Sequence, residues 1–265
     1  MKNWEKMFSS LRKGSKSDKD TAAYRAAFET HTTGSGASSQ PPAAASGAMP
    51  RTFEEVRRHL EDIWSNILLE SGGKVDRLMF CGAAPGAGCS FLSFHLALFL
   101  AAVHSMKTLY VDTAIDKPGH IPCVSGMVGR SGLASFLTGE AQLDSLVATT
   151  DYDNLFVLPS GARQGAQSVH KHIISGQALE GLASFCSSRF DIAIFDGQAV
   201  TSHPLSIEFA KRIGNVIMVC RYGNSRREVS MVSIDKLRKN GIPVTGVVLN
   251  DRQLPVPPAF YAIMK

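Results

Sequence analysis

The fold of this sequence is decided by the stretch Cys81-Gly82-Ala83-Ala84-Pro85-Gly86-Ala87-Gly88-Cys89-Ser90. It follows the apolar run Leu78-Met79-Phe80 and precedes a helix-like segment at residues 91–103, which is the strand, glycine loop and helix order of a phosphate-binding P-loop. In such a loop, backbone N–H groups converge on the phosphates, a lysine reaches their oxygens, and a Ser/Thr hydroxyl holds Mg²⁺. Here the glycines and the Ser90 hydroxyl are present, but Cys89 stands where the lysine is expected. The stretch therefore predicts a nucleotide-type fold whose chemistry is weakened or lost.

Composition indicates a globular domain with a tail. At 265 residues, 44% apolar and 19% charged, the chain can bury a substantial core. The net charge of +5 favours an acidic partner such as a nucleotide or an anionic membrane; we expect no nucleic-acid partner. Five scattered cysteines without a Cys-x-x-Cys pair, and no signal peptide, predict a cytoplasmic protein, with the inner face of the membrane as an alternative location.

The chain divides near residue 50. Residues 13–50 are dominated by Ser, Gly, Ala, Thr, Pro and charge, so they predict a flexible linker within a disordered, basic N-terminal tail, residues 1–50. At the start of this tail, apolar residues recur at helical spacing among lysines and arginines: Trp4, Met7, Phe8 and Leu11. Two interpretations stay open, a short amphipathic helix that contacts a membrane or a partner, and a disordered terminus with chance spacing.

Residues 51–265 have the pattern of an α/β domain. Thr52 is a candidate helix cap before an apolar stripe that includes Leu60, Trp64 and Ile67. Short apolar runs then alternate with helical stretches, at residues 78–80, 108–111, 155–158, 192–195, 216–220 and 244–249. This alternation predicts a parallel sheet sandwiched by helices, with ligands at the carboxyl ends of its strands.

Two carboxylates come at predicted strand ends. Asp112 follows the second run, and Asp196 follows the strongly apolar residues 192–195. A single Asp at a strand end is often a turn residue, but two of them beside a glycine loop favour a cation site. Together with Ser90 they are candidate ligands for Mg²⁺.

From about Thr52 onward the chain resembles the cytoplasmic domain of bacterial tyrosine kinases (BY-kinases) and of their relatives in capsule and exopolysaccharide synthesis. These proteins are a branch of the Min-type and Par-type P-loop ATPases. The family's Ala-Pro-Gly-x-Gly-Lys-Ser/Thr loop corresponds to residues 84–90, its Asp-x-Asp-x-Arg-x-Pro motif to residues 112–118, and its Walker B strand to residues 192–196. Residues 132–144 are similar to its GLxxxLxGE…LD stretch, and residues 158–161 to its LPAG segment.

The resemblance implies a P-loop NTPase fold of the Min/Par type that binds ATP or ADP with Mg²⁺. Carried over position by position, it implies nucleotide contacts from the loop and from the end of the last strand: Pro85, Gly86, Ala87, Gly88, Cys89, Ser90, Asn250 and Arg252. It implies Mg²⁺ ligands at Ser90, Asp112 and Asp196. Two residues depart from the family pattern, since Cys89 replaces the lysine and Ala114 replaces a second carboxylate.

These departures make an efficient kinase a poor prediction, because phosphoryl transfer depends on neutralising charge on the transferred oxygens. Lys74, Lys107 and Lys117 are alternative sources of positive charge, without support from the sequence alone. A thiol at a helix N-terminus ionises more readily, so Cys89 is also a candidate redox switch, although a small residue in place of the lost lysine is the simpler interpretation.

We therefore predict a regulatory or scaffold component of exopolysaccharide biosynthesis or export. The alternatives are an active tyrosine autokinase or ATPase of the same pathway, and a Min/Par-type positioning ATPase. The resemblance implies a membrane-spanning chain-length regulator as a partner in a separate chain. It also implies self-association through a Glu-x-x-Arg pattern, here Glu54, Arg57 and Arg58; an ordinary solvated helix face explains those charges equally well.

Overall fold

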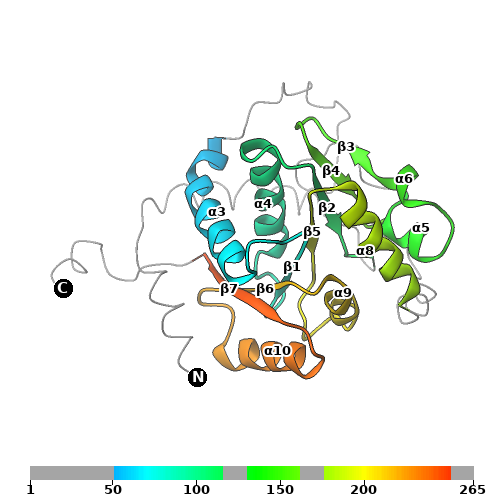
Figure 1. Ribbon diagram of the computed structural model, residues 1–265. Coiled ribbons are helices and arrows are strands. Elements are labelled where there is room, and N and C mark those ends of the chain that lie inside the picture. The colour runs from blue at the N-terminus through cyan, green and yellow to red at the C-terminus, as the bar shows by residue number, and fades with distance from the viewer. Residues whose placement is uncertain (1–50, 116–129, 162–175, 252–265) are drawn as a thin grey trace, which may run out of the picture. The chain divides into compact units, whose positions relative to one another are not determined.

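The computed structural model describes residues 51–115, 130–161 and 176–251. Within them, one seven-stranded sheet has the order β3-β4-β2-β5-β1-β6-β7 (Figure 1). Every neighbouring pair is parallel except β3 and β4, which are antiparallel. The predictions for the tail at residues 1–50, for Lys117 and for Arg252 lie outside the described residues.

The strands alternate with helices along the chain, as the sequence predicts. The strands are β1 (Arg77–Gly82), β2 (Thr108–Asp112), β3 (Ala148–Thr149), β4 (Leu155–Leu158), β5 (Ile192–Asp196), β6 (Val216–Arg221) and β7 (Val244–Asn250). The helices are α3 (Arg51–Glu70), α4 (Cys89–Val103), α5 (Leu133–Leu137), α6 (Leu143–Leu146), α8 (Gln177–Arg189), α9 (Leu205–Ile213) and α10 (Arg227–Lys239).

All six predicted strands are present, so the predicted α/β fold class is confirmed. The sequence did not indicate β3, which has two residues and pairs antiparallel with β4 at the edge of the sheet. Two residues are too few to show an alternating or apolar pattern. Helix α3 begins at Arg51, so Thr52 lies in its first turn and is not the cap that the sequence suggested.

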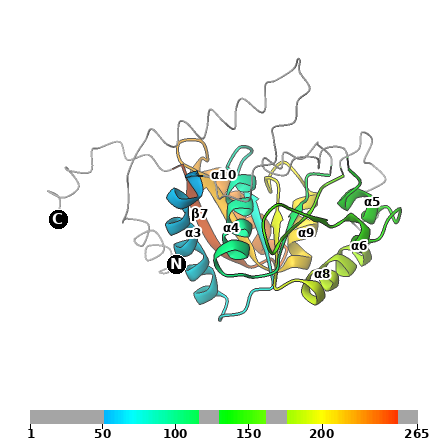
Figure 2. The same ribbon diagram turned by 90° about the horizontal axis from the view of Figure 1, so that it is seen from above.

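Helices cover both faces of the sheet (Figure 1). Helices α3 and α4 lie side by side on one face, as the view from above also shows (Figure 2), whereas α8, α9 and α10 pack on the other. Helix α4 is buried from Leu92 to Ala101; it packs on the central strands β1, β2 and β5 and against the neighbouring helix α3. Among the described helices, none combines the length and the apolar character that crossing a bilayer requires.

The core confirms the apolar stripe predicted for α3. Leu60, Trp64 and Ile67 are buried and belong to one hydrophobic cluster with α4 and the central strands. The side chains of β2 and β5 are buried throughout, which explains why both strands read as continuous apolar runs rather than alternating ones. Burial of each large aliphatic or aromatic side chain stabilises the fold by about 1.5–3 kcal/mol.

Residues 132–144 and residues 158–161, which resemble the family's GLxxxLxGE…LD and LPAG stretches, pack against each other. The backbone N–H groups of Leu133 and Ala134 donate to the carbonyls of Pro159 and Ser160, at 2.8 and 2.9 Å. A Cβ atom at Gly132 would clash with the carbonyl oxygen of Pro159. Glycine at position 132 therefore permits the close approach that joins the start of α5 to the end of β4.

Candidate phosphate-binding site

The glycine loop lies at the carboxyl end of β1 and leads directly into α4. Gly86 and Gly88 have φ angles of 74° and 96°, which L side chains rarely adopt. Gly88 is the N-cap of α4, and the backbone N–H groups of Gly88 and Ser90 have no hydrogen-bond acceptor in the described part of the chain. Free N–H groups at the positive end of a helix can bind an anion.

Cys89 does not supply the charge of the missing lysine. Its side chain packs against the hydrophobic cluster, and its Sγ would lie 3.4 Å from a Cβ atom built on Gly82. Burial raises the pKa of the Cys89 thiol well above its usual value, and the nearby Asp196 carboxylate raises this pKa further. The thiol is therefore neutral near pH 7, contrary to the more easily ionised thiol that its place at a helix N-terminus suggested.

The two predicted carboxylates are brought together by the sheet. Asp112 and Asp196 are register partners on the neighbouring strands β2 and β5, and both are buried. The Tyr110 hydroxyl donates a 2.9 Å hydrogen bond to Oδ2 of Asp196, and Oδ1 of Asp112 accepts one from the backbone N–H of Ala114 at 2.9 Å.

The Asp196 carboxyl group has an unusually high pKa. Burial raises its pKa to about 7; hydrogen bonding from Ser90 acts in the opposite direction, and the Asp112 charge raises the pKa again. Two carboxylates this close in a buried site cannot both ionise without cost unless a cation accompanies them.

The donor set fits Mg²⁺. Oδ1 of Asp196 is buried and has no hydrogen-bond partner among the described residues, so it is an orphaned oxygen at the edge of the phosphate loop. Oxygen ligands from Asp112, Asp196 and Ser90, completed by water and phosphate, match the preference of this hard cation. A cation bound there would neutralise the two carboxylates and carry charge stabilisation to a bound phosphate.

Two of the alternative lysines lie at the wrong end of the sheet. Lys74 and Lys107 precede β1 and β2, so they lie at the amino ends of the strands, whereas the loop lies at the carboxyl ends. The Lys107 Nζ lies 5.2 Å from the centre of the Phe190 ring and 5.6 Å from that of Phe156. It therefore makes cation–π contacts far from the loop.

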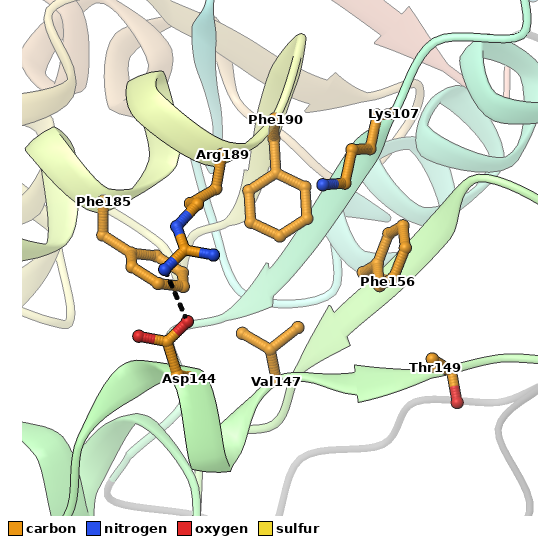
Figure 3. A pocket seen from close by; sticks show the side chains of 8 residues that line it. All are labelled: Lys107, Asp144, Val147, Thr149, Phe156, Phe185, Arg189 and Phe190. Carbon is orange, nitrogen blue, oxygen red and sulfur yellow. Dashed lines mark ion pairs between the residues drawn. The ribbon is translucent and has the colours of Figure 1, made fainter.

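Figure 3 shows the hollow that contains Lys107. This cavity of about 160 Å³ is also lined by Asp144, Phe185 and Arg189, and a 3.1 Å ion pair joins Arg189 to Asp144. The hollow does not include any residue of the phosphate loop.

The last two strands bring further side chains to the loop. Asn250 Nδ2 donates to the carbonyl of Ala87 at 3.0 Å. Arg221, which the sequence did not single out, donates from Nη1 to the carbonyl of Gly86 at 3.4 Å and from Nε and Nη2 to Oδ2 of Asp251 at 3.0 and 2.9 Å. Its position directly after the apolar residues 216–220 is the signal that could have identified it, as for Asp112 and Asp196.

Several other predicted site residues are exposed to solvent. Pro85 and Gly86 are exposed at the loop, where a ligand can reach them. Arg57 and Arg58 are exposed on α3, as a subunit contact requires, and the side chain of Glu54 lies outside the description. Tyr110 is a site residue that the sequence did not reveal, because it reads as part of a core strand.

Comparisons with known proteins agree with this geometry. The chain is 27% identical over 174 residues to the tyrosine-protein kinase wzc of Salmonella typhimurium, covering 65% of this chain and 23% of that protein. It is 25% identical over 183 residues to the tyrosine-protein kinase ptk of Acinetobacter johnsonii, covering 69% of this chain and 24% of that protein. The chain thus spans about a quarter of the length of these relatives. No family model matches it.

Solved structures show the same architecture. The chimerical protein CapA2B2 superposes with a TM-score of 0.65 at 26% identity, over 74% of this chain and 85% of that one. The kinase domain of the Escherichia coli tyrosine kinase ETK gives 0.68 at 18% identity, over 82% and 87%. The septum site-determining protein MinD of Pyrococcus horikoshii, complexed with Mg-ADP, gives 0.56 at 19% identity, over 70% and 75%.

The fold is that of the Min/Par-type P-loop ATPases, with a mostly parallel sheet and a glycine loop that follows strand β1. Within that class, the named relatives and the matching kinase domains are those of bacterial tyrosine kinases. The chain is thus similar in sequence, over 65–69% of its length, to these tyrosine-protein kinases.

Proposed function

We propose that this chain is a catalytically weakened BY-kinase-like protein that binds a nucleotide and acts as a regulatory or scaffold component of exopolysaccharide biosynthesis or export. The observation that carries the proposal is the neutral, partly buried Cys89 thiol at the lysine position of an otherwise well-formed phosphate loop. The cradle keeps its N–H groups and its acidic edge, so binding of ADP or ATP with Mg²⁺ is supported. Efficient cleavage is not, because the charge that would follow the transferred oxygens is missing.

Arg221 does not replace that charge. Its guanidinium group is paired with the Asp251 carboxylate at 2.9 Å and with a loop carbonyl. Ala114 further lacks the carboxylate that the family pattern has at this position, which could activate a hydroxyl or position water.

The same proposal includes binding partners for the chain. We propose that the protein works beside a membrane-spanning chain-length regulator in a separate chain, and that Glu54, Arg57 and Arg58 contribute to self-association. A basic tail at residues 1–50 would add peripheral contact with an anionic membrane surface.

Calorimetry with Mg-ADP and Mg-ATP, combined with a phosphate-release assay, tests the catalytic part. We expect the unmodified chain to bind nucleotide with little turnover. We expect Cys89→Lys to raise the rate by up to about 10²–10³-fold, since one preorganised electrostatic contact has roughly that effect. Cys89→Met, with a long but neutral side chain, is the matched control and should leave the rate unchanged.

The alternative of a working tyrosine autokinase is favoured by one observation, the names of the relatives, which are tyrosine-protein kinases. Rapid phosphate release or tyrosine phosphorylation by the unmodified chain would establish this alternative and exclude a weakened enzyme. A positioning ATPase of the Min/Par type predicts focal localisation in cells that lack the polysaccharide genes.

A further inference from the structure

Side chains from β6 and β7 hold the phosphate loop by its carbonyl groups. Asn250 binds the carbonyl of Ala87, and Arg221 binds that of Gly86. Arg221 ends β6 and Asn250 ends β7, so two strands late in the chain hold the loop that follows β1.

The contact at Ala87 sets the direction of a phosphate-facing N–H group. In a trans peptide unit, the carbonyl of one residue and the N–H of the next point in opposite directions. Because Asn250 draws the Ala87 carbonyl towards β7, the N–H of Gly88 points away from β7. This is one of the N–H groups without an acceptor in the described residues.

Asn250 itself is rigidly placed. Its backbone carbonyl accepts a 2.9 Å hydrogen bond from the N–H of Tyr222, and its Cα is the register partner of Arg221. A Cβ atom on Gly88 would clash with Nδ2 of Asn250, so the amide lies directly against the Gly88 backbone. The adjacent Asp251, with a φ of 54°, binds Arg221 through two nitrogens.

We infer that Asn250, supported by the Arg221–Asp251 pair, is a positioning residue for the phosphate chain of a bound nucleoside di- or triphosphate. It acts through the loop backbone and keeps the N–H of Gly88 aimed at the phosphates. The inference rests on the proposed function, because it requires that the loop binds phosphate. It gives Asn250 a different role from the adenine contact that the family resemblance implies.

A ligand without a base separates the two roles. We would measure the binding of inorganic tripolyphosphate and of ATP, each with Mg²⁺, to the full chain and to Asn250→Ala by calorimetry. Loss of one hydrogen bond predicts about threefold to tenfold weaker binding, by the same factor for both ligands. Asn240→Ala is the matched control, because Asn240 makes a similar side-chain contact to the carbonyl of Lys236, at the other end of α10.

Asn250→Asp is the second variant, because it keeps the side-chain shape but replaces the N–H donor with a carboxylate oxygen that repels the Ala87 carbonyl. It should weaken tripolyphosphate binding at least as much as Asn250→Ala. Thermal unfolding of the ligand-free variants checks that each still folds. A folded variant with weaker binding of both ligands and unchanged binding by Asn240→Ala supports the inference.

Three results would overturn it. Weaker binding of ATP alone would make Asn250 a base contact, and unchanged binding of both ligands would remove it from the site. If the unmodified chain binds neither ligand, the proposed function fails as well, and that outcome is recognised before any variant is measured.

Discussion

Asp196 is buried beside a second carboxylate, so the folded chain holds its proton more tightly than the unfolded chain does. Its pKa is about 7 in the folded state, against an ordinary value of 3.8 for an aspartate in the unfolded chain. Between these two values the unfolded chain has released the proton while the folded chain still keeps it. The free energy of unfolding therefore falls as the pH rises through this window.

We predict that this single group lowers stability by roughly 4 kcal/mol between about pH 4 and pH 7. Asn at this position cannot ionise, so Asp196→Asn should be more stable relative to the unmodified chain at pH 8 than at pH 5. Urea unfolding at the two pH values measures the difference. Asp235→Asn, at an exposed position on α10, is the control; equal pH dependence in all three proteins would contradict the prediction.

At Cys89, a rule based on the position in the helix is outweighed by the surroundings of the side chain. A helix N-terminus alone favours the thiolate, but burial and the Asp196 charge favour the thiol. The second effect prevails because desolvation of an ionised sulfur costs more free energy than the dipole at one helix N-terminus contributes in stabilisation.

At the scale of elements, the ends of the parallel strands collect the candidate site. Asp112, Asp196 and Arg221 each end their strand, and the glycine loop follows the end of β1. Because parallel strands present their carboxyl ends at one edge, residues that are more than one hundred positions apart in sequence meet there.

Replacing each of two glycines by alanine should have opposite effects on stability. Gly132 lies against the Pro159 carbonyl, so Gly132→Ala should destabilise by about 1–3 kcal/mol through overpacking. Gly181 lies within α8, and a Cβ there would meet only Cζ of Phe136, at an ordinary 3.7 Å. Gly181→Ala should therefore stabilise by about 0.5–1 kcal/mol.

Urea midpoints of the two variants give the comparison, with each serving as the control for the other. A loss of stability in both would mean that α8 does not tolerate a methyl group at position 181. A neutral Gly132→Ala would mean that α5 can shift away from the end of β4.

At the scale of the whole molecule, the exposed arginines of α3 test self-association. We predict that the double variant Arg57→Glu and Arg58→Glu weakens association in sedimentation velocity, because it reverses the charge of a proposed subunit contact. Lys239→Glu, exposed at the end of α10, is the control for charge alone. A wild-type chain that stays monomeric at every concentration, with and without Mg-nucleotide, would speak against a subunit contact.

The similarity to tyrosine kinases also belongs to this scale. The chain superposes on the chimerical protein CapA2B2 and on the ETK kinase domain over most of their length. It spans only about a quarter of the relatives matched by sequence. A shared fold does not transmit an activity, so the loop chemistry carries more weight here than the resemblance.

Much of the fold was readable from the sequence alone. The six apolar runs, the glycine loop and the stripe of α3 are local patterns, and local periodicity depends on the backbone geometry of one element. The loop, Asp112 and Asp196 were found in the same way, by their place directly after apolar runs. Strand β3 and the start of α3 were not, because a two-residue strand and a helix end leave little local signal.

Only the tertiary structure decided what those residues do to one another. The raised pKa of Asp196, the neutral state of Cys89, the wrong location of Lys74 and Lys107, and the contacts of Asn250 and Arg221 with the loop all arise between distant segments. Burial and electrostatic interactions depend on distance in space, which no spacing along the chain specifies.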